Sequence, residues 1–300
     1  MCFRGKRSDA QGTLTVTLNR QQLLEWKVDD IVQTYTERDT MLYSLSLGLG
    51  MNPIDPAELS YVLEPAPNVF PTMALVLGNP GPWTGHPALG IDRKVIVHGE
   101  QGIVWHRGLP ASGTVIGQTR VLDVIDKGAE KGALLLTERK LYLAESNELI
   151  ASITGTTVCR GNGGFGGPSG PVPPPHKLPD RAPDLAVDMP TTPQAALLYR
   201  LNGDYNTLHA DPVRARQAGF PRPISHGLFS FGLCARAVVQ THCDMDGARL
   251  KAFSGRFASP AYPGETLRIQ LWRDDDVVSF NAIEPLRNVQ VVSNGRAHIA

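Results

Sequence analysis

Residues 227–239 read Gly-Leu-Phe-Ser-Phe-Gly-Leu-Cys-Ala-Arg-Ala-Val-Val, a run that is apolar on nearly every side when wound as a helix. Pro and Gly punctuation at residues 223–227 gives way to this run, which predicts that a helix begins near Leu228. A surface helix keeps one polar face, so a helix without such a face has to be enclosed by other elements. We therefore expect the helix Leu228–Val239 to lie inside a curved sheet.

Strand-like segments with short turns close each half of the chain. The alternation of Leu267, Ile269 and Leu271 with polar residues is typical of a half-buried antiparallel strand. Each half begins with helical segments and ends in such a run of strands, so the halves look like one unit written twice. The sequence thus indicates an α+β fold of two curved antiparallel sheets, each wrapping a central helix. The predicted strands are Val115–Val124, Gly132–Leu143 and Glu148–Val158, then Leu267–Trp272, Val277–Ile283 and Asn288–Ile299.

A stretch rich in Gly and Pro separates the two halves. In residues 160–183, 13 of 24 residues are Gly or Pro, a composition that cannot sustain a helix or a central strand. Gly161 to Gly166 match the Gly-x-Gly-x-x-Gly pattern of dinucleotide sites, but Pro168 follows where the required helix would have to open. We interpret the stretch as a linker. The expected organisation is an N-terminal extension (1–26), a first half (27–159), the linker (160–183) and a second half (184–300).

Charge and cysteine content exclude several classes of protein. With 29 basic and 29 acidic side chains there is no overall field to attract nucleic acid or an anionic membrane. No run of about 18 apolar residues occurs, and the N-terminal residues lack the apolar stretch of a signal peptide. The four cysteines lack Cys-x-x-Cys spacing, which predicts reduced thiols. We expect a cytoplasmic protein without nucleic-acid or membrane partners.

The candidate catalytic side chains lie in residues 199–209, Tyr-Arg-Leu-Asn-Gly-Asp-Tyr-Asn-Thr-Leu-His. A Gly-Asp turn carries Asp204 out of the preceding helical segment, and His209 can return to the same side. Such a pair can hold a water molecule between two groups of different basicity, and burial is expected to raise the pKa of Asp204. The N–H of Gly227, at the start of the predicted helix, is placed to bind an oxyanion.

Other interpretations of these residues fit less well. Asp-x-Asn can begin a calcium loop, but Leu208 occupies the next alternate position, and no Gly or Glu follows at the required spacing. We therefore expect no metal. Ser225 and His226 are adjacent and cannot form a nucleophile–base pair.

The order of these motifs resembles the MaoC-like (R)-specific enoyl-CoA hydratases, the type-two hydratases. Gly-Asp-x-Asn-x-Leu-His-x-Asp-Pro at 203–212 precedes Ala-Gly-Phe at 218–220 and Pro-Ile-x-His-Gly-Leu at 223–228. The similarity extends over about residues 30–300, and one departure is Thr207, where the family usually has Pro. The resemblance implies a double hot-dog fold, in which the halves form a pseudo-dimer. It continues in Val-His-Gly-Glu-Gln at 97–101, Gly-Gly-Phe-Gly-Gly at 163–167 and Arg-Phe-Ala-Ser-Pro-Ala-Tyr-Pro-Gly at 256–264.

The resemblance implies a hydro-lyase of fatty acyl metabolism. It would reversibly hydrate a trans-2-enoyl-CoA to (3R)-3-hydroxyacyl-CoA without a metal or redox cofactor, coenzyme A being part of the substrate. Asp204 is the favoured base and His209 the proton carrier. Asn206 would orient the turn or the water, and the Gly227 N–H would polarise the thioester carbonyl. Contacts to the acyl-CoA are expected from His98, Gly99, Lys127, Tyr205 and Phe257.

Two alternatives stay open beside the hydratase. One is a hot-dog thioesterase or a dehydratase acting on carrier-protein thioesters. The other is a catalytically idle acyl-CoA-binding protein, which the Thr207 departure makes conceivable. The intact Asp, Asn, His and Gly favour the hydratase, and a homodimer is compatible with it.

The first half lacks the catalytic imidazole. Aligning the halves on their opening helices places Asp39 at Asp204 and Ser44 at His209. Residues 43–51, in which leucines alternate with small residues, could then either line a cavity for the acyl tail or pack as ordinary core.

Overall fold

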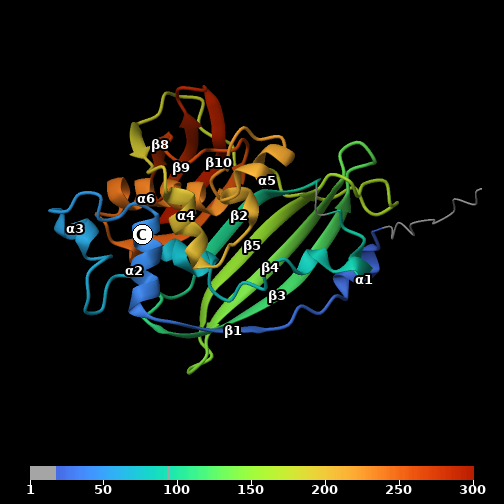
Figure 1. Cartoon of the computed structure of the whole chain (residues 1–300), viewed down its shortest axis with the longest axis horizontal. Helices are drawn as coiled ribbons and strands as arrows, with labels where there is room; N and C mark the ends of the chain where they lie inside the picture. Colours follow the sequence, from blue (N-terminus) through green and yellow to red (C-terminus); the bar gives the residue numbers. More distant parts are fainter. Residues whose placement is uncertain (1–17, 93–94) are drawn as a thin grey trace, which may run out of the picture.

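Ten antiparallel strands form one continuous sheet in the computed structural model, which describes residues 18–92 and 95–300 (Figure 1). The strands are β1 Ile31–Tyr35, β2 Ile96–Trp105, β3 Gly113–Asp126, β4 Ala133–Leu143, β5 Leu149–Cys159, β6 Leu185–Pro190, β7 Leu250–Phe257, β8 Thr266–Asp274, β9 Val277–Glu284 and β10 Val289–Ile299. Their order is β1-β3-β4-β5-β2-β7-β10-β9-β8-β6, so five strands precede the linker and five follow it. β2 pairs with β7 and joins the two sets. All six predicted strands are confirmed.

Short helices connect the strands, and one long helix lies among them. The α-helices are α1 Arg20–Leu24, α2 Glu37–Ser46, α3 Pro56–Leu59, α4 Ala195–Tyr199, α5 Pro212–Gln217 and α6 Gly227–His242. The 3₁₀ turns are η1 Pro71–Leu75, η2 Trp83–Gly85, η3 Pro87–Leu89, η5 Arg200–Asn202, η6 Thr207–His209 and η7 Gly247–Arg249.

Helix α6 is the enclosed helix that the sequence predicts. Its residues 229–239 are all buried, and the ring of Phe231 lies edge-on to Phe253 of β7 at 4.8 Å between centroids. A Cβ on Gly232 would come within 2.7 Å of the Leu47 side chain, so this glycine lets the first half pack closely on α6. Burying a leucine completely stabilises a fold by about 1.5–3 kcal/mol. The prediction of an apolar helix inside the sheet is confirmed.

The first half differs from the expected plan in one respect. Among its described residues the longest helix is α2, and none matches the length of α6. Phe70, Met73 and Leu75, in and beside η1, instead contribute to the same hydrophobic core as α6. The enclosed helix of the second half is therefore shared by both halves.

The opening helices of the two halves meet at equivalent residues. Tyr43 of α2 faces Tyr199 at the end of α4, with 6.0 Å between ring centroids. Asn202 donates a hydrogen bond of 3.0 Å to the hydroxyl of Ser46. Both pairs are separated by 156 residues in sequence (199 − 43 and 202 − 46), as expected where duplicated helices meet across a pseudo-two-fold axis.

This spacing corrects the sequence alignment of Asp39 with Asp204, which assumed a separation of 165 residues. Asp39 forms a capping box with Thr36 at the start of α2 and has a purely local role. Leu47 and Leu49 are buried in the main core, so the interpretation of residues 43–51 as core packing fits the structure.

The linker carries no helix or strand between residues 160 and 183, in agreement with its composition. The carboxylate of Asp126 accepts hydrogen bonds from the backbone N–H groups of Gly164 and Gly166, both at 2.8 Å. These bonds and one from Gly128 hold the pKa of Asp126 below its usual value. The glycine N–H groups that would cradle a phosphate in a dinucleotide site are thus bound to the protein's own carboxylate.

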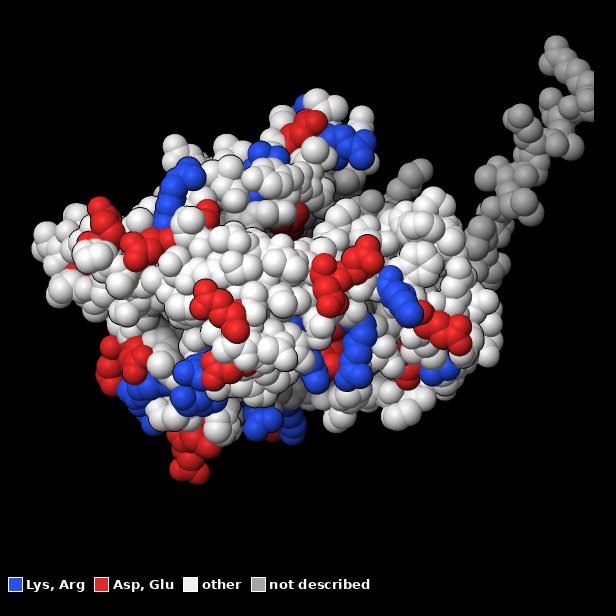
Figure 2. Space-filling view, turned by 90° about the horizontal axis from the view of Figure 1, so that it is seen from below, with Lys and Arg blue, Asp and Glu red and all other residues white. Residues whose placement is uncertain are grey.

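Acidic and basic side chains are interspersed on the face shown in Figure 2, in line with the balanced composition. Within the described ranges, no helix has the length and apolar character needed to cross a membrane.

Candidate active site

The loop after η5 presents two of the predicted catalytic residues. Gly203 has a φ of 113°, a left-handed conformation that favours glycine, and the chain turns there. The next residue, Asp204, accepts a hydrogen bond of 3.1 Å from the backbone N–H of Asn206. The Asn206 side chain in turn accepts one of 3.1 Å from the N–H of Leu208 and so caps η6. Asn206 therefore fixes the turn between Asp204 and His209.

The burial expected of Asp204 is not found. The residue is exposed, because the turn at Gly203 directs it away from the core. This corrects the argument that the protein alone supplies an apolar pocket for the carboxylate.

His209 is buried and has a defined tautomer. Its Nδ1 lies 2.9 Å from the carbonyl oxygen of Ile224, and because a carbonyl can only accept, Nδ1 carries the proton. Its Nε2 is then left with a free lone pair. Burial lowers the pKa of His209 and favours this neutral ring.

His226 completes the cluster, although no role in the site was predicted for it. Its ring stacks on His209 with 3.8 Å between centroids, and its Nε2 donates a 3.2 Å hydrogen bond to the backbone carbonyl of Asp204. Burial, with the neighbouring His209, lowers the pKa of His226 to about 4. His226 thus contacts the His209 ring and the Asp204 backbone as a neutral imidazole. Its position directly before Gly227 was the sequence signal that could have identified it.

The same three residues are the candidates for a metal site. Ligating atoms of Asp204, His209 and His226 all lie within 4.8 Å of one another. A carboxylate with two imidazoles can bind a divalent cation. A cation there would compete with water for these groups, and the expectation of no metal stays a prediction.

Gly227 lies where the sequence places it, at the first residue of α6. The N-cap residue His226 gives α6 no side-chain hydrogen bond, so its side chain does not cap the first N–H groups of this helix. A Cβ on Gly227 would come 3.2 Å from the ring of Phe257. Phe257 also contacts His98, with 4.6 Å between ring centroids. Gly227, Phe257 and His98 therefore form one wall beside the cluster of Asp204, His209 and His226.

Of the other residues predicted to contact the acyl-CoA, Gly99 and Tyr205 adjoin residues of the candidate site, whereas Lys127 does not. Gly99 lies at a β-bulge of β2, next to His98. Tyr205 is 57% exposed, with the Arg200 guanidinium 5.0 Å from its ring centroid. Lys127 follows β3, three strands away from β2, or about 14 Å at the usual strand spacing. Its ammonium donates to the carbonyl of Ser169 in the linker, so the structure does not bring Lys127 to the cluster.

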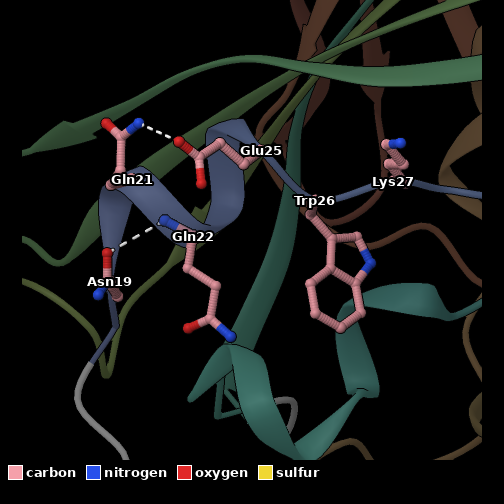
Figure 3. A pocket seen from close by; sticks show the side chains of 6 residues that line it. All are labelled: Asn19, Gln21, Gln22, Glu25, Trp26 and Lys27. Carbon is pink, nitrogen blue, oxygen red and sulfur yellow. Dashed lines mark hydrogen bonds between the residues drawn. The ribbon is translucent and has the colours of Figure 1, made fainter.

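Two surface hollows lie apart from the predicted site residues. One borders α1 (Figure 3), where Gln21 bonds to Glu25 and Asn19 caps the helix. The other, of about 580 Å³, includes Met245 and Gly247 beyond the C-terminal end of α6. Neither is lined by Asp204, His209 or the residues of their wall.

Comparison with known proteins assigns both halves. The family model of the MFE-2 hydratase 2 N-terminal domain matches residues 33–161, and that of the MaoC like domain matches residues 175–294. The enoyl-CoA hydratase ChsH3 of Mycobacterium tuberculosis is 39% identical over 267 residues, which cover 87% of this chain and 92% of that protein. The chain belongs to the MaoC-like enoyl-CoA hydratase 2 family.

Further members of this hydratase family span nearly the whole chain. A peroxisomal enoyl-CoA hydratase 2 from Arabidopsis thaliana is 35% identical over 291 residues, covering 92% of this chain and 94% of that protein. The crystal structure of a MaoC-like dehydratase from Phytophthora capsici has a TM-score of 0.82 at 32% identity and covers 93% of this chain and 98% of that one.

A solved Mycobacterium tuberculosis protein described as a double hot-dog fold has a TM-score of 0.55 at 14% identity, so that likeness concerns the fold alone. It covers 91% of this chain and 95% of that one. The double hot-dog prediction and the family resemblance are confirmed.

The family's usual proline is replaced by Thr207 here. Thr207 is the first residue of η6. Proline suits this position because the N–H that it lacks has no acceptor within the helical turn. The turn closes without the proline because Asn206 caps it.

Proposed function

We propose that this hydro-lyase adds water to trans-2-enoyl-CoA, yields (3R)-3-hydroxyacyl-CoA, and also catalyses the reverse dehydration. The observation that carries the proposal is the cluster in which Asp204 and the neutral His209 lie within 4.8 Å of each other, beside the start of α6. The family membership supports the same reaction. The R configuration rests on the family alone.

Hydration needs one water molecule, a group that accepts a proton from this water and a group that donates a proton to Cα. The water donates one hydrogen bond to the Asp204 carboxylate and one to Nε2 of His209. Its oxygen bonds to Cβ of the enoyl group, while one proton passes to this pair and the pair returns a proton to Cα. All atoms of the water thus enter the product. General acid–base catalysis of this kind contributes about 10²–10⁴-fold to a rate.

The thioester carbonyl acquires negative charge when water attacks Cβ. The N–H of Gly227 would donate to this oxygen at the N-terminus of α6, a helix of 16 residues whose dipole also favours an anion. One such donor is worth about 3 kcal/mol in comparable sites. The rings of Phe257 and His98 would shield the enoyl group from bulk water.

The path of the substrate, the absence of a cofactor, the cellular location and the oligomeric state belong to the same proposal. The acyl-CoA would pass Tyr205, whose ring is exposed and which directly follows Asp204 in the chain, and no metal or redox cofactor would take part. We place the enzyme in the cytoplasm as a homodimer acting in fatty acyl metabolism. The three described cysteines are free and buried, which supports a reducing compartment.

A substrate panel with product analysis tests the function. Loss of enoyl absorbance is followed for trans-2-enoyl-CoAs of increasing length, free thiol is measured in parallel, and the hydroxyacyl product is resolved on a chiral column. The proposal expects the 3R product without thiol release. Thiol release would identify a thioesterase, activity only on carrier-protein thioesters would identify a carrier-protein dehydratase, and binding without product would identify an idle acyl-CoA-binding protein.

A further inference from the structure

The inner face of the first half carries polar side chains between two hydrophobic clusters. Leu141 of β4 belongs to the main core, whereas Leu135 of the same strand belongs to a second cluster with Val121 and Cys159. Residues 135, 137, 139 and 141 point to one face because side chains alternate along a strand. Thr137 and Arg139 therefore face inward between the clusters.

Cross-strand pairing extends this polar row toward the active site. Directly paired residues share a face of the sheet. Arg139 pairs with Thr119 of β3, Thr137 pairs with Gly155 of β5, and Thr157 of β5 pairs with His98 of β2. In Figure 1 the strands β2, β5, β4 and β3 lie side by side in this order. We call the set the polar band: His98, Thr157, Gly155, Thr137, Arg139 and Thr119.

The polar band borders accessible space. Five of its six residues are only partly buried, although they point inward, while Leu135 and Leu141 on either side are fully buried. An inward-facing residue keeps accessible surface only where the interior is not filled. The band is therefore a row of inward-facing polar residues that keep part of their surface accessible.

Arg139, the most buried member, has an incomplete set of partners. One terminal nitrogen donates a 2.6 Å hydrogen bond to the carbonyl of Leu75, while Nε has no partner among the described residues. The adjacent hydroxyl of Thr119 is also buried and has no partner in the part of the chain that the structure describes. Across residues 18–92 and 95–300, Arg139 forms no ion pair, although a guanidinium offers five N–H donors.

The other buried arginine of the fold shows what is missing. Arg236 is 7% exposed and forms a 2.6 Å ion pair with Glu58, whereas Arg139 is 8% exposed and has only a neutral acceptor. Burial without a counter-ion lowers the pKa of Arg139 to about 10. A buried charge of this kind is costly unless an anion pairs with it.

The polar band leads from the catalytic residues to this guanidinium. His98, at one end, contacts Phe257, which packs on Gly227. Arg139 lies on β4, two strands away from β2, or about 10 Å across the sheet. Leu135 stands opposite His98 through Thr157, so Arg139 also lies four residues, or about 13 Å, further along β4. An acyl chain whose thioester is held at Gly227 and which follows the band would end at Arg139.

We propose that the polar band binds the distal part of the acyl chain and that Arg139 pairs with a carboxylate at its far end. The preferred substrates are then trans-2-enoyl-CoAs with a second, terminal carboxylate. A carboxylate matches the planar guanidinium and can also accept from the Thr119 hydroxyl. This inference rests on the proposed hydratase function, which supplies the acyl-CoA.

The first test compares matched substrates on the wild-type protein. For each chain length from hexenoyl to dodecenoyl, kcat/KM is measured for a methyl-ended and a carboxylate-ended enoyl-CoA. We expect a preference of about ten-fold or more for the carboxylate at one or more lengths, the size of one charge-assisted hydrogen bond. A preference for the methyl end at every length would overturn the inference. Failure to hydrate any substrate, crotonyl-CoA included, would instead refute the proposed function.

Variants then assign the effect to the guanidinium. Arg139→Met should abolish the carboxylate preference through KM, and Thr119→Val should reduce it. Arg120→Met is the matched control, because Arg120 is the next residue of β3, points outward and pairs with Glu138. If the ratio of kcat/KM between carboxylate-ended and methyl-ended substrates were equal in Arg139→Met and wild type, Arg139 would serve only to bind the carbonyl of Leu75, and the inference would be wrong. If Arg139→Met does not fold, the wild-type ratio and Thr119→Val decide the matter.

Discussion

Replacing Glu58 by Gln should strongly destabilise the protein by leaving the Arg236 charge buried. Glu58 of α3 and Arg236 of α6 form a 2.6 Å ion pair that joins the halves. Both residues are 7% exposed. Arg236 also donates 3.0 Å to the carbonyl of Leu47, and Glu58 accepts 2.9 Å from the N–H of Gly50.

The structure sets the size of this effect. Breaking a buried pair by removing one charge costs about 3–5 kcal/mol, because the remaining charge stays desolvated. Gln keeps the shape and one acceptor, so we expect about 3 kcal/mol in the free energy of unfolding. Replacing both residues by Met should cost less than the sum of the two single Met substitutions, since no charge is then left unpaired.

Urea unfolding measures the loss as a change of midpoint at constant m-value. Asp188→Asn is the control, because it breaks an ion pair with Arg268 in which both side chains are about half exposed. Such a pair contributes less than about 1 kcal/mol. If Glu58→Gln lost no more stability than Asp188→Asn, the argument from burial would be wrong.

Three further predictions concern acid stability, the oxyanion donor and metal. Desolvation inside the fold lowers the folded-state pKa of His98 to about 4, below its unfolded value of 6.5. The contribution of neutral His98 to the free energy of unfolding is therefore complete above pH 6.5 and is lost as the pH falls toward 4. The loss amounts to at most about 3 kcal/mol. Between pH 7 and 4.5 the urea midpoint should fall less steeply in His98→Gln than in wild type. Parallel plots of midpoint against pH for the two proteins would contradict this prediction. Gly227→Ala should lower kcat on crotonyl-CoA about ten-fold or more, because its Cβ would lie 3.2 Å from Phe257 and shift the donor; unchanged kcat would remove Gly227 from the mechanism. Dialysis against a chelator should leave turnover unchanged, whereas a loss that a divalent cation restores would assign Asp204, His209 and His226 to a metal.

Local patterns predicted much of the fold. Helix α6 and six strands follow from composition and alternation within a few residues. β2 was not among the predicted strands, because glycines interrupt its alternation. They are there for packing: a Cβ on Gly102 would come 2.5 Å from the Thr154 hydroxyl of β5. The continuous sheet depends on the pairing of β2 with β7, a long-range contact that no local pattern encodes.

The sequence predicted which residues form the candidate site better than it predicted their burial and their neighbours. Asp204, Asn206 and His209 follow from a short motif, and the turn between them behaves as expected. The exposure of Asp204 depends on how Gly203 directs the chain. The role of His226 depends on its stacking against a ring 17 positions earlier in the sequence (226 − 209). Both features arise only when the segments pack together.

The most direct test is the turnover number of Asp204→Asn and His209→Ala on crotonyl-CoA, with Asp180→Asn, an exposed linker carboxylate, as control. If Asp204 and His209 activate the water together, both variants should fold normally and lose about 100-fold or more in kcat, while the control keeps full activity. Turnover close to the wild-type value in either variant would contradict the assignment of catalysis to this pair.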